Sequence, residues 1–167
     1  MSYDLFTFRL PPGADPSDYA TEVAEAFDEV VEPGPSDPSV AQLIAAFRAV
    51  FPGADLVEED EQSAMVLLEE RLVSVDLRPK CADICVSYGV ANDATWLTDL
   101  LAKIREAAAD AGHDTLFDAQ LDRPVDPSDP ADAAEIGRFW GDGLEMVAEL
   151  RAEHDGGGFF KRLFRRR

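Results

Sequence analysis

The sequence predicts an α+β fold: a mixed or antiparallel sheet of about five strands with helices mainly on one face, followed by a C-terminal helix and a basic tail. Strand-like segments run together in the middle of the chain, whereas a parallel α/β protein would alternate them with helices. Residues 72–77 alternate apolar and polar side chains, as a strand with one solvated face does. A chain of 167 residues that is 46% hydrophobic can also bury a full core.

The chain opens with a predicted strand over residues 3–10. Leu5 points to one face of this strand, and Phe6 and Phe8 point to the other. Apolar side chains on both faces favour an interior position in the sheet rather than an edge.

Two helices begin with the same signal, an aspartate followed by a proline at Asp15-Pro16 and Asp37-Pro38. Aspartate accepts hydrogen bonds from the first unpaired N–H groups, and proline at the first helical position loses no needed donor. The second helix carries an apolar stripe at helical spacing. Its members are Val40, Leu43, Ile44, Phe47, Val50 and Phe51.

Most of the sheet is expected in the middle of the chain. Residues 55–62 are so acidic that we interpret them as a connector. Residues 64–68 and 72–77 are predicted as two strands, or as one long strand with a kink, and 82–88 as another strand. Most of the predicted sheet is therefore built from strands that follow one another in the sequence.

The last elements are a helix over 94–111, a short strand over 115–121, a proline-rich connector over 122–130 and a fourth helix to about Glu153. The fourth helix has a set of apolar residues, and we expect it to lie against the domain. These residues are Ile136, Phe139, Trp140, Leu144, Val147 and Leu150. Three glycines should weaken the helix by roughly 1 kcal/mol each relative to alanine. They are Gly137, Gly141 and Gly143.

We divide the chain into an α+β domain (1–121), a connector with an accessory helix (122–155) and a flexible tail (156–167). Charge is segregated along it. Residues 159–167 hold five basic residues and no acidic ones, and the other 158 residues hold 10 basic and 34 acidic residues. A body this acidic repels phosphates, which argues against nucleic-acid binding and favours a basic partner.

The tail has the composition of an interfacial helix after a triple-glycine hinge. As a helix it would place its apolar residues within an arc of about 140°, opposite its basic residues. Such a segment can dock on a partner's groove or on an anionic membrane, fold back on its own acidic body, or remain disordered. The residues predicted to bind are Phe159, Phe160, Lys161, Arg162, Leu163, Phe164, Arg165, Arg166 and Arg167.

Candidate catalytic chemistry is sparse. No phosphate-binding loop or hydrolase motif is present, and neither a metal nor a cofactor is predicted. An enzyme would use Asp4, Asp118 or His113 in a cleft, and clustering of the three would favour it, although His113 also suits a cap at the end of a helix. Cys81 and Cys85 lie on a predicted strand about 13 Å apart, too far for a disulfide or a shared metal.

Two short motifs carry a family resemblance. The opening residues 1–6 (MSYDLF) and residues 116–120 (LFDAQ) resemble a loose group of small uncharacterised bacterial proteins that start MSYDL and have a late yDPQ-like strand. Ala119 stands where those proteins usually have proline. Some of them sit beside toxin–immunity systems, and the group implies no catalytic residues for this chain.

These observations predict a non-enzymatic, acidic protein-interaction module of the immunity or antitoxin kind, with the tail as a docking element. The alternatives are a peripheral membrane adaptor anchored by the tail and a small enzyme with a carboxylate–histidine cleft. Without a signal peptide or an apolar run long enough to span a bilayer, we expect a cytoplasmic location, or a peripheral one at the inner membrane face.

Overall fold

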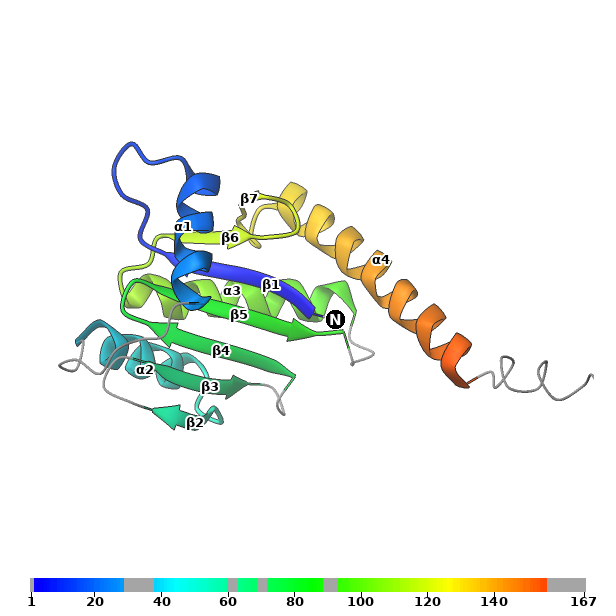
Figure 1. Cartoon of the computed structure of the whole chain (residues 1–167), viewed down its shortest axis with the longest axis horizontal. Helices are drawn as coiled ribbons and strands as arrows, with labels where there is room; N and C mark the ends of the chain where they lie inside the picture. The colour runs from blue at the N-terminus through cyan, green and yellow to red at the C-terminus, as the bar shows by residue number, and fades with distance from the viewer. Residues whose placement is uncertain (1, 29–37, 60–62, 69–71, 89–92, 156–167) are drawn as a thin grey trace, which may run out of the picture.

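The computed structural model describes residues 2–28, 38–59, 63–68, 72–88 and 93–155 (Figure 1). The strands are β1 (Ser2–Phe8), β2 (Asp55–Glu59), β3 (Ala64–Leu68), β4 (Val73–Arg78), β5 (Cys81–Ser87), β6 (Thr115–Asp118) and β7 (Arg123–Pro124). The helices are α1 (Pro16–Asp28), α2 (Pro38–Val50), α3 (Ala94–Asp110) and α4 (Pro130–Asp155).

The strands form one antiparallel sheet in the order β2-β3-β4-β5-β1-β6-β7. The predicted α+β class is confirmed, with seven strands rather than about five. β1 lies between β5 and β6, so the prediction of an interior first strand is also confirmed. The consecutive strands β2 to β5 form the part of the sheet that neighbouring hairpins build.

The main core lies between one face of the sheet and helices α2 and α3, with α4 packed against α3 (Figure 1). Leu5 faces this core from β1, and Phe47 faces it from α2. Trp140 of α4 joins the same cluster and is fully buried. The base of α4 is therefore part of the core of the domain.

The opposite face of the sheet is divided between apolar and polar surface. Helix α1 covers one part of it, with Val23 in a smaller cluster beside Phe8 and Phe117. Elsewhere on this face the positions of β4 and β5 are mostly polar, among them Asp76 and Asp83, which pair across the two strands. Met65 and Leu67 of β3 lie on the same face and are half-exposed. The alternation predicted for residues 72–77 therefore holds, because one side is buried and the other half-exposed.

The start of α1 behaves as its sequence predicts, whereas Asp37 of the second predicted start lies outside the described residues. The Asp15 carboxylate accepts from the backbone N–H groups of Ser17 (2.9 Å) and Asp18 (3.2 Å), which caps α1. At the end of α3, Gly112 has a φ of +90°, a conformation that glycine adopts without steric cost.

Two expectations about irregular segments need correction. Residues 55–62 are not simply a connector, because Asp55–Glu59 form the edge strand β2, paired with β3, and Leu56 packs against the core. The strand predicted over 115–121 is shorter: β6 ends at Asp118, where the carboxylate accepts from the backbone N–H groups of Gln120 and Leu121 and forms a turn.

Candidate functional site: the exposed edge of helix α4

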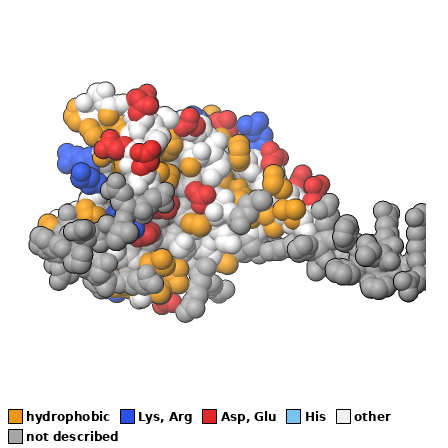
Figure 2. Space-filling view, viewed as in Figure 1, with side chains coloured by type: hydrophobic (Ala, Val, Ile, Leu, Met, Phe, Trp, Pro, Cys, Tyr) orange, Lys and Arg blue, Asp and Glu red, His pale blue; other side chains and the backbone are white. Residues whose placement is uncertain are grey.

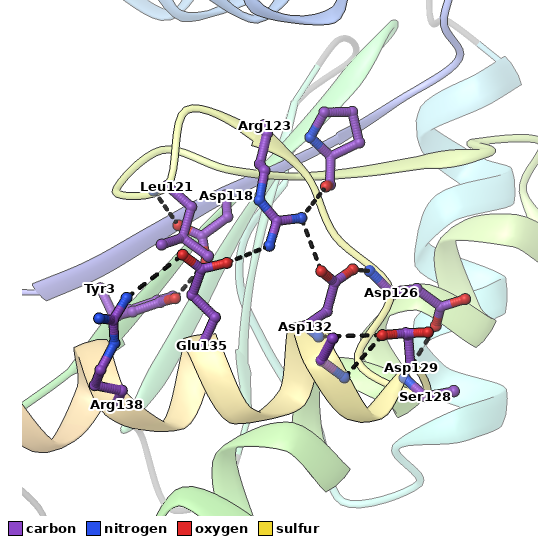
Figure 3. Close-up of polar contacts among 12 residues, drawn as sticks. Tyr3, Asp118, Leu121, Arg123, Asp126, Ser128, Asp129, Asp132, Glu135 and Arg138 are labelled. Carbon is purple, nitrogen blue, oxygen red and sulfur yellow. Dashed lines mark hydrogen bonds and ion pairs between the residues drawn. The ribbon is translucent and has the colours of Figure 1, made fainter.

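Helix α4 is fixed at its N-terminal end by charged side chains (Figure 3). The guanidinium of Arg123 contacts the carboxylates of Asp132 (2.8 Å) and Glu135 (2.6 Å), one helical turn apart. Asp129 caps the helix by accepting from the N–H of Ala131 at 2.8 Å. The contacts of Arg123 hold the first turns of α4 to strand β7.

The aromatic ring of Trp140 anchors the middle of the helix. It stacks on Tyr88 with ring centroids 4.6 Å apart, and meets Tyr3 edge-on at 6.0 Å. Gly137 and Gly143 flank this anchor on α4, and a Cβ at either position would meet a neighbour at less than 3.0 Å. Two glycines that the sequence analysis treated as weak points are therefore close-approach positions.

Next to this anchor and beyond it, α4 exposes apolar side chains. Phe139, Met146 and Leu150 are 37%, 51% and 51% exposed, and we call them the α4 stripe. On an ideal helix they fall within an arc of about 40°, next to the face that Trp140 buries. The C-terminal half of α4 extends away from the sheet in Figure 1, and none of the described strands lies beneath it there.

Acidic side chains border the α4 stripe. Asp142, Glu145 and Glu149 are all exposed, and they follow one another at helical spacing. Figure 2 shows acidic and hydrophobic side chains next to each other along this projecting part. The surface therefore combines a narrow apolar strip with a negative margin.

The expectation that the fourth helix lies against the domain is correct for one face of the helix, as far as Val147. Ile136 and Trp140 are buried, and Leu144 and Val147 are partly buried against the core. Phe139 and Leu150, which we grouped with them, are exposed instead. The sequence did hold a signal for this exposure. The apolar residues of α4 cover a wider arc of the helix than a single packed face can bury, so some of them had to be exposed.

The predicted binding residues of the tail, 159–167, lie outside the described residues, as does the side chain of His154. The α4 stripe was not predicted as a binding surface. Met146 was missed because a methionine among acidic residues gives little signal alone. The position of Met146 is informative only in relation to Phe139. The two residues are seven positions apart and therefore share one face of the helix.

The carboxylates of the proposed catalytic cleft lie on different faces of the sheet. Asp118 is buried on the core side, where Tyr3 donates to it, and burial raises the pKa of its carboxyl. Asp4 alternates with Tyr3 and Leu5 in β1, so its side chain projects to the opposite face.

His113 lies at the far end of β6 from Asp118. Its Nδ1 is 3.1 Å from the Thr7 hydroxyl, so the side chain does not cap α3 as predicted, although its backbone N–H bonds the Ala108 carbonyl. Burial lowers the pKa of His113, which disfavours the charged form that a cap would use. The cleft that would require all three residues is therefore not formed.

The two cysteines are free thiols on β5, as their spacing predicts. Burial raises the pKa of Cys81 to about 12, so this thiol is not a nucleophile at neutral pH. Within the described residues, no cluster of His, Cys, Asp and Glu could hold a metal ion. None of the described helices is long and apolar enough to cross a bilayer.

No protein family model, curated protein or solved structure matches the chain. The resemblance to small bacterial proteins beginning MSYDL stays a prediction. The geometry and charge of α4 are therefore the basis for assigning a function.

Proposed function

We propose that the protein is a non-enzymatic interaction module whose α4 stripe docks a basic amphipathic helix of a protein partner. The observation that supports this proposal is that α4 exposes Phe139, Met146 and Leu150 to solvent, although the base of the same helix is anchored in the core. An amphipathic helix recognises such a surface through apolar anchors at helical spacing.

Charge complementarity selects the partner. The α4 stripe is bordered by the acidic residues Asp142, Glu145 and Glu149, and the whole chain has a net charge of −19. A cationic helix would be steered to this surface, and an anionic one repelled. The stripe is narrow, so we expect a small, transient interface whose affinity falls with added salt.

The basic tail provides a second docking element in this proposal. It follows α4 directly after Asp155, at the projecting end of the helix. A partner that occupies the α4 stripe is therefore within reach of the tail, and two linked contacts bind more tightly than either does alone. Immunity and antitoxin proteins fit this description as acidic partners of basic proteins.

The test uses synthetic helical peptides that share one apolar face and differ only in net charge, positive, neutral or negative. Binding of the full chain is measured by fluorescence anisotropy. We expect the cationic peptide to bind best, and M146D/L150D to weaken it by about tenfold or more, because charge would enter the apolar contact.

The matched control is V57D, since Val57 is also 50% exposed but lies on β2. V57D should bind like the unmodified chain. Equal binding by M146D/L150D, or binding that ignores peptide charge, would contradict the proposal. Flotation of the chain with anionic liposomes, lost in high salt but unaffected by M146D/L150D, would point to the membrane adaptor instead.

A further inference from the structure

A second surface feature lies at the end of the sheet where strand β1 ends and strand β5 begins. It is a hollow of about 390 Å³, within the size range of small-molecule pockets. The polar side chains that line it come from helices α1 and α2 and from the segments that join strands and helices. They are Arg9, Tyr19, Ser39, Gln42, Lys80 and His113.

The charge of this pocket is opposite to that of the body. Arg9 and Lys80 both line it, although the chain outside the tail has only 10 basic residues. Neither side chain forms an ion pair with any residue in the described part of the chain. Figure 2 shows Lys and Arg side chains gathered at the corresponding left edge of the molecule. Two cations that form no ion pair among the described residues make this a local positive site in a protein of net charge −19, although Asp114 lies near Arg9.

His113 forms part of the wall and is only 6% exposed. Nδ1 lies 3.1 Å from the Thr7 hydroxyl, and the ring also hydrogen-bonds the Thr7 backbone. A protonated imidazole donates from both nitrogens. An anion beside the ring would stabilise that form, and the pocket would gain a third positive group.

Fixed structure surrounds these groups. The Ser39 hydroxyl donates to the Pro79 carbonyl at 2.6 Å, which ties the start of α2 to the turn that carries Lys80. The N-terminal end of α2 adds a partial positive charge at this wall. Tyr19 and Gln42 add neutral hydrogen-bond donors to the lining.

We propose that this pocket binds a small phosphate-bearing anion through Arg9, Lys80 and His113. A small anion feels mainly the charges of the pocket, because solvent ions screen the acidic body beyond a Debye length of about 8 Å at physiological salt. A nucleic acid would extend over that body and meet its repulsion. This site lies apart from α4, and it does not depend on the function proposed for that helix.

Other titratable groups surround the pocket. Asp114 lies beside Arg9, and its carboxylate accepts from the Leu10 N–H at 3.1 Å, which lowers its pKa and keeps it charged. Glu22 lies near Tyr19 on α1. These carboxylates offset part of the positive charge, so a singly or doubly charged anion suits the pocket better than a polyphosphate.

The test is an NMR titration of the histidine imidazoles in the full chain with inorganic phosphate, with sulfate and acetate at equal ionic strength for comparison. The chain has two histidines, so His154 reports non-specific effects in the same sample. We expect a saturable shift of the His113 signals with phosphate, and a higher His113 pKa in its presence. A response to acetate as strong as to phosphate would show a general carboxylate site and overturn the assignment to phosphate.

Variants locate the effect. R9Q and K80Q should each weaken phosphate binding by about tenfold, the loss expected for one charge-assisted contact. K103Q, which removes a lysine on α3 outside this pocket, should bind phosphate normally. Absence of saturation, a matching shift of His154, or equal weakening by K103Q would overturn the proposal.

Discussion

The phenol of Tyr3 donates a hydrogen bond to the buried carboxylate of Asp118, 115 residues away in the sequence. Asp118 also accepts from the backbone of Gln120 and Leu121, so a single carboxylate connects the first strand to the turn that ends β6. Burial raises the pKa of both side chains, because each charged form would lose its hydration. The pair sits beneath α4, where Tyr3 also meets Trp140. The base of the helix therefore rests on a satisfied polar contact inside an aromatic cluster.

Removing the Tyr3 hydroxyl should destabilise the protein. In Y3F, one Asp118 oxygen loses its donor inside the core, and an unsatisfied buried acceptor costs about 1–3 kcal/mol. The free energy of unfolding in urea would show this loss. The matched control is Y19F, because Tyr19 is only half-buried and packs by its ring against Phe8. If Y3F and Y19F were equally stable, the hydrogen bond would not contribute to the fold.

Asp83 should limit stability at neutral pH. Burial, with the nearby charges of Asp4 and Asp76, raises the pKa of Asp83 from 3.8 to about 6. Because the folded-state pKa lies above the unfolded value, the protonated Asp83 carboxyl contributes to the free energy of unfolding. This contribution is fully present below pH 3.8 and is lost as pH rises through about 6. D83N, which cannot ionise, should therefore be more stable than the unmodified chain above pH 6.

The expected gain for D83N is about 1 kcal/mol once solvent screening of a partly exposed group is considered. Urea unfolding from pH 4 to pH 8 would measure it, and the two chains should converge at the acidic end. D18N is a control on an exposed carboxylate of α1. A gain that does not depend on pH would show that ionisation is not its cause.

His113 has the opposite pH dependence. Burial lowers its pKa from the ordinary value of 6.5, so the unfolded chain binds the proton more tightly than the folded one. The stability that follows from the neutral imidazole is present above that value and is lost as pH falls below it. Between pH 8 and pH 5, the unmodified chain should therefore lose more unfolding free energy than H113Q does.

The same urea series would give this difference, with H154Q as the control for losing a histidine elsewhere. H113Q also loses the contact with Thr7, which should lower its stability by a constant amount at every pH. Parallel pH profiles for H113Q and the unmodified chain would contradict the assigned pKa shift.

Local signals in the sequence were enough to predict elements that depend on nearby residues. The Asp15-Pro16 start of α1 needs only a capping oxygen and a fixed φ, and both are properties of those residues. Likewise, Val73 and Val75 alternate with polar neighbours because β4 has one buried face. Such patterns require no knowledge of the rest of the fold.

Elements whose state depends on distant partners were not predictable in this way. Strand β2 was interpreted as a connector because its residues are mostly acidic, and only pairing with β3 makes it a strand. Leu150 was grouped with the buried residues of α4, yet its exposure depends on where the body ends beneath the helix. The pocket beside His113 is lined by Arg9, Lys80 and residues of α2. These come from separate parts of the chain, so no local sequence motif predicts the pocket.

The tail should contribute to binding without contributing to folding. All described core residues lie before Leu150, so deletion of 156–167 should change the unfolding free energy by less than about 0.5 kcal/mol. Cross-linked recovery of a protein partner should be abolished. A variant with serine in place of Phe159, Phe160, Leu163 and Phe164 keeps the tail's charge, and so separates apolar docking from simple attraction. Unchanged recovery after the deletion would refute the docking role.

The glycines of α4 offer the sharpest test of how the helix is seated. A Cβ on Gly143 would lie 2.3 Å from the Tyr88 ring, whereas a Cβ on Gly141 would meet nothing within 4 Å. G141A should stabilise the chain by about 0.5–1 kcal/mol, the helix propensity gained when alanine replaces glycine. G143A gains the same propensity but forces the helix away from Tyr88, and overpacking of this kind costs about 1–3 kcal/mol. Urea unfolding followed by tryptophan fluorescence would also report the stack of Trp140 on Tyr88. If G143A proved as stable as G141A, α4 would not approach the sheet at Tyr88, and the anchor that holds the stripe in place would be wrong.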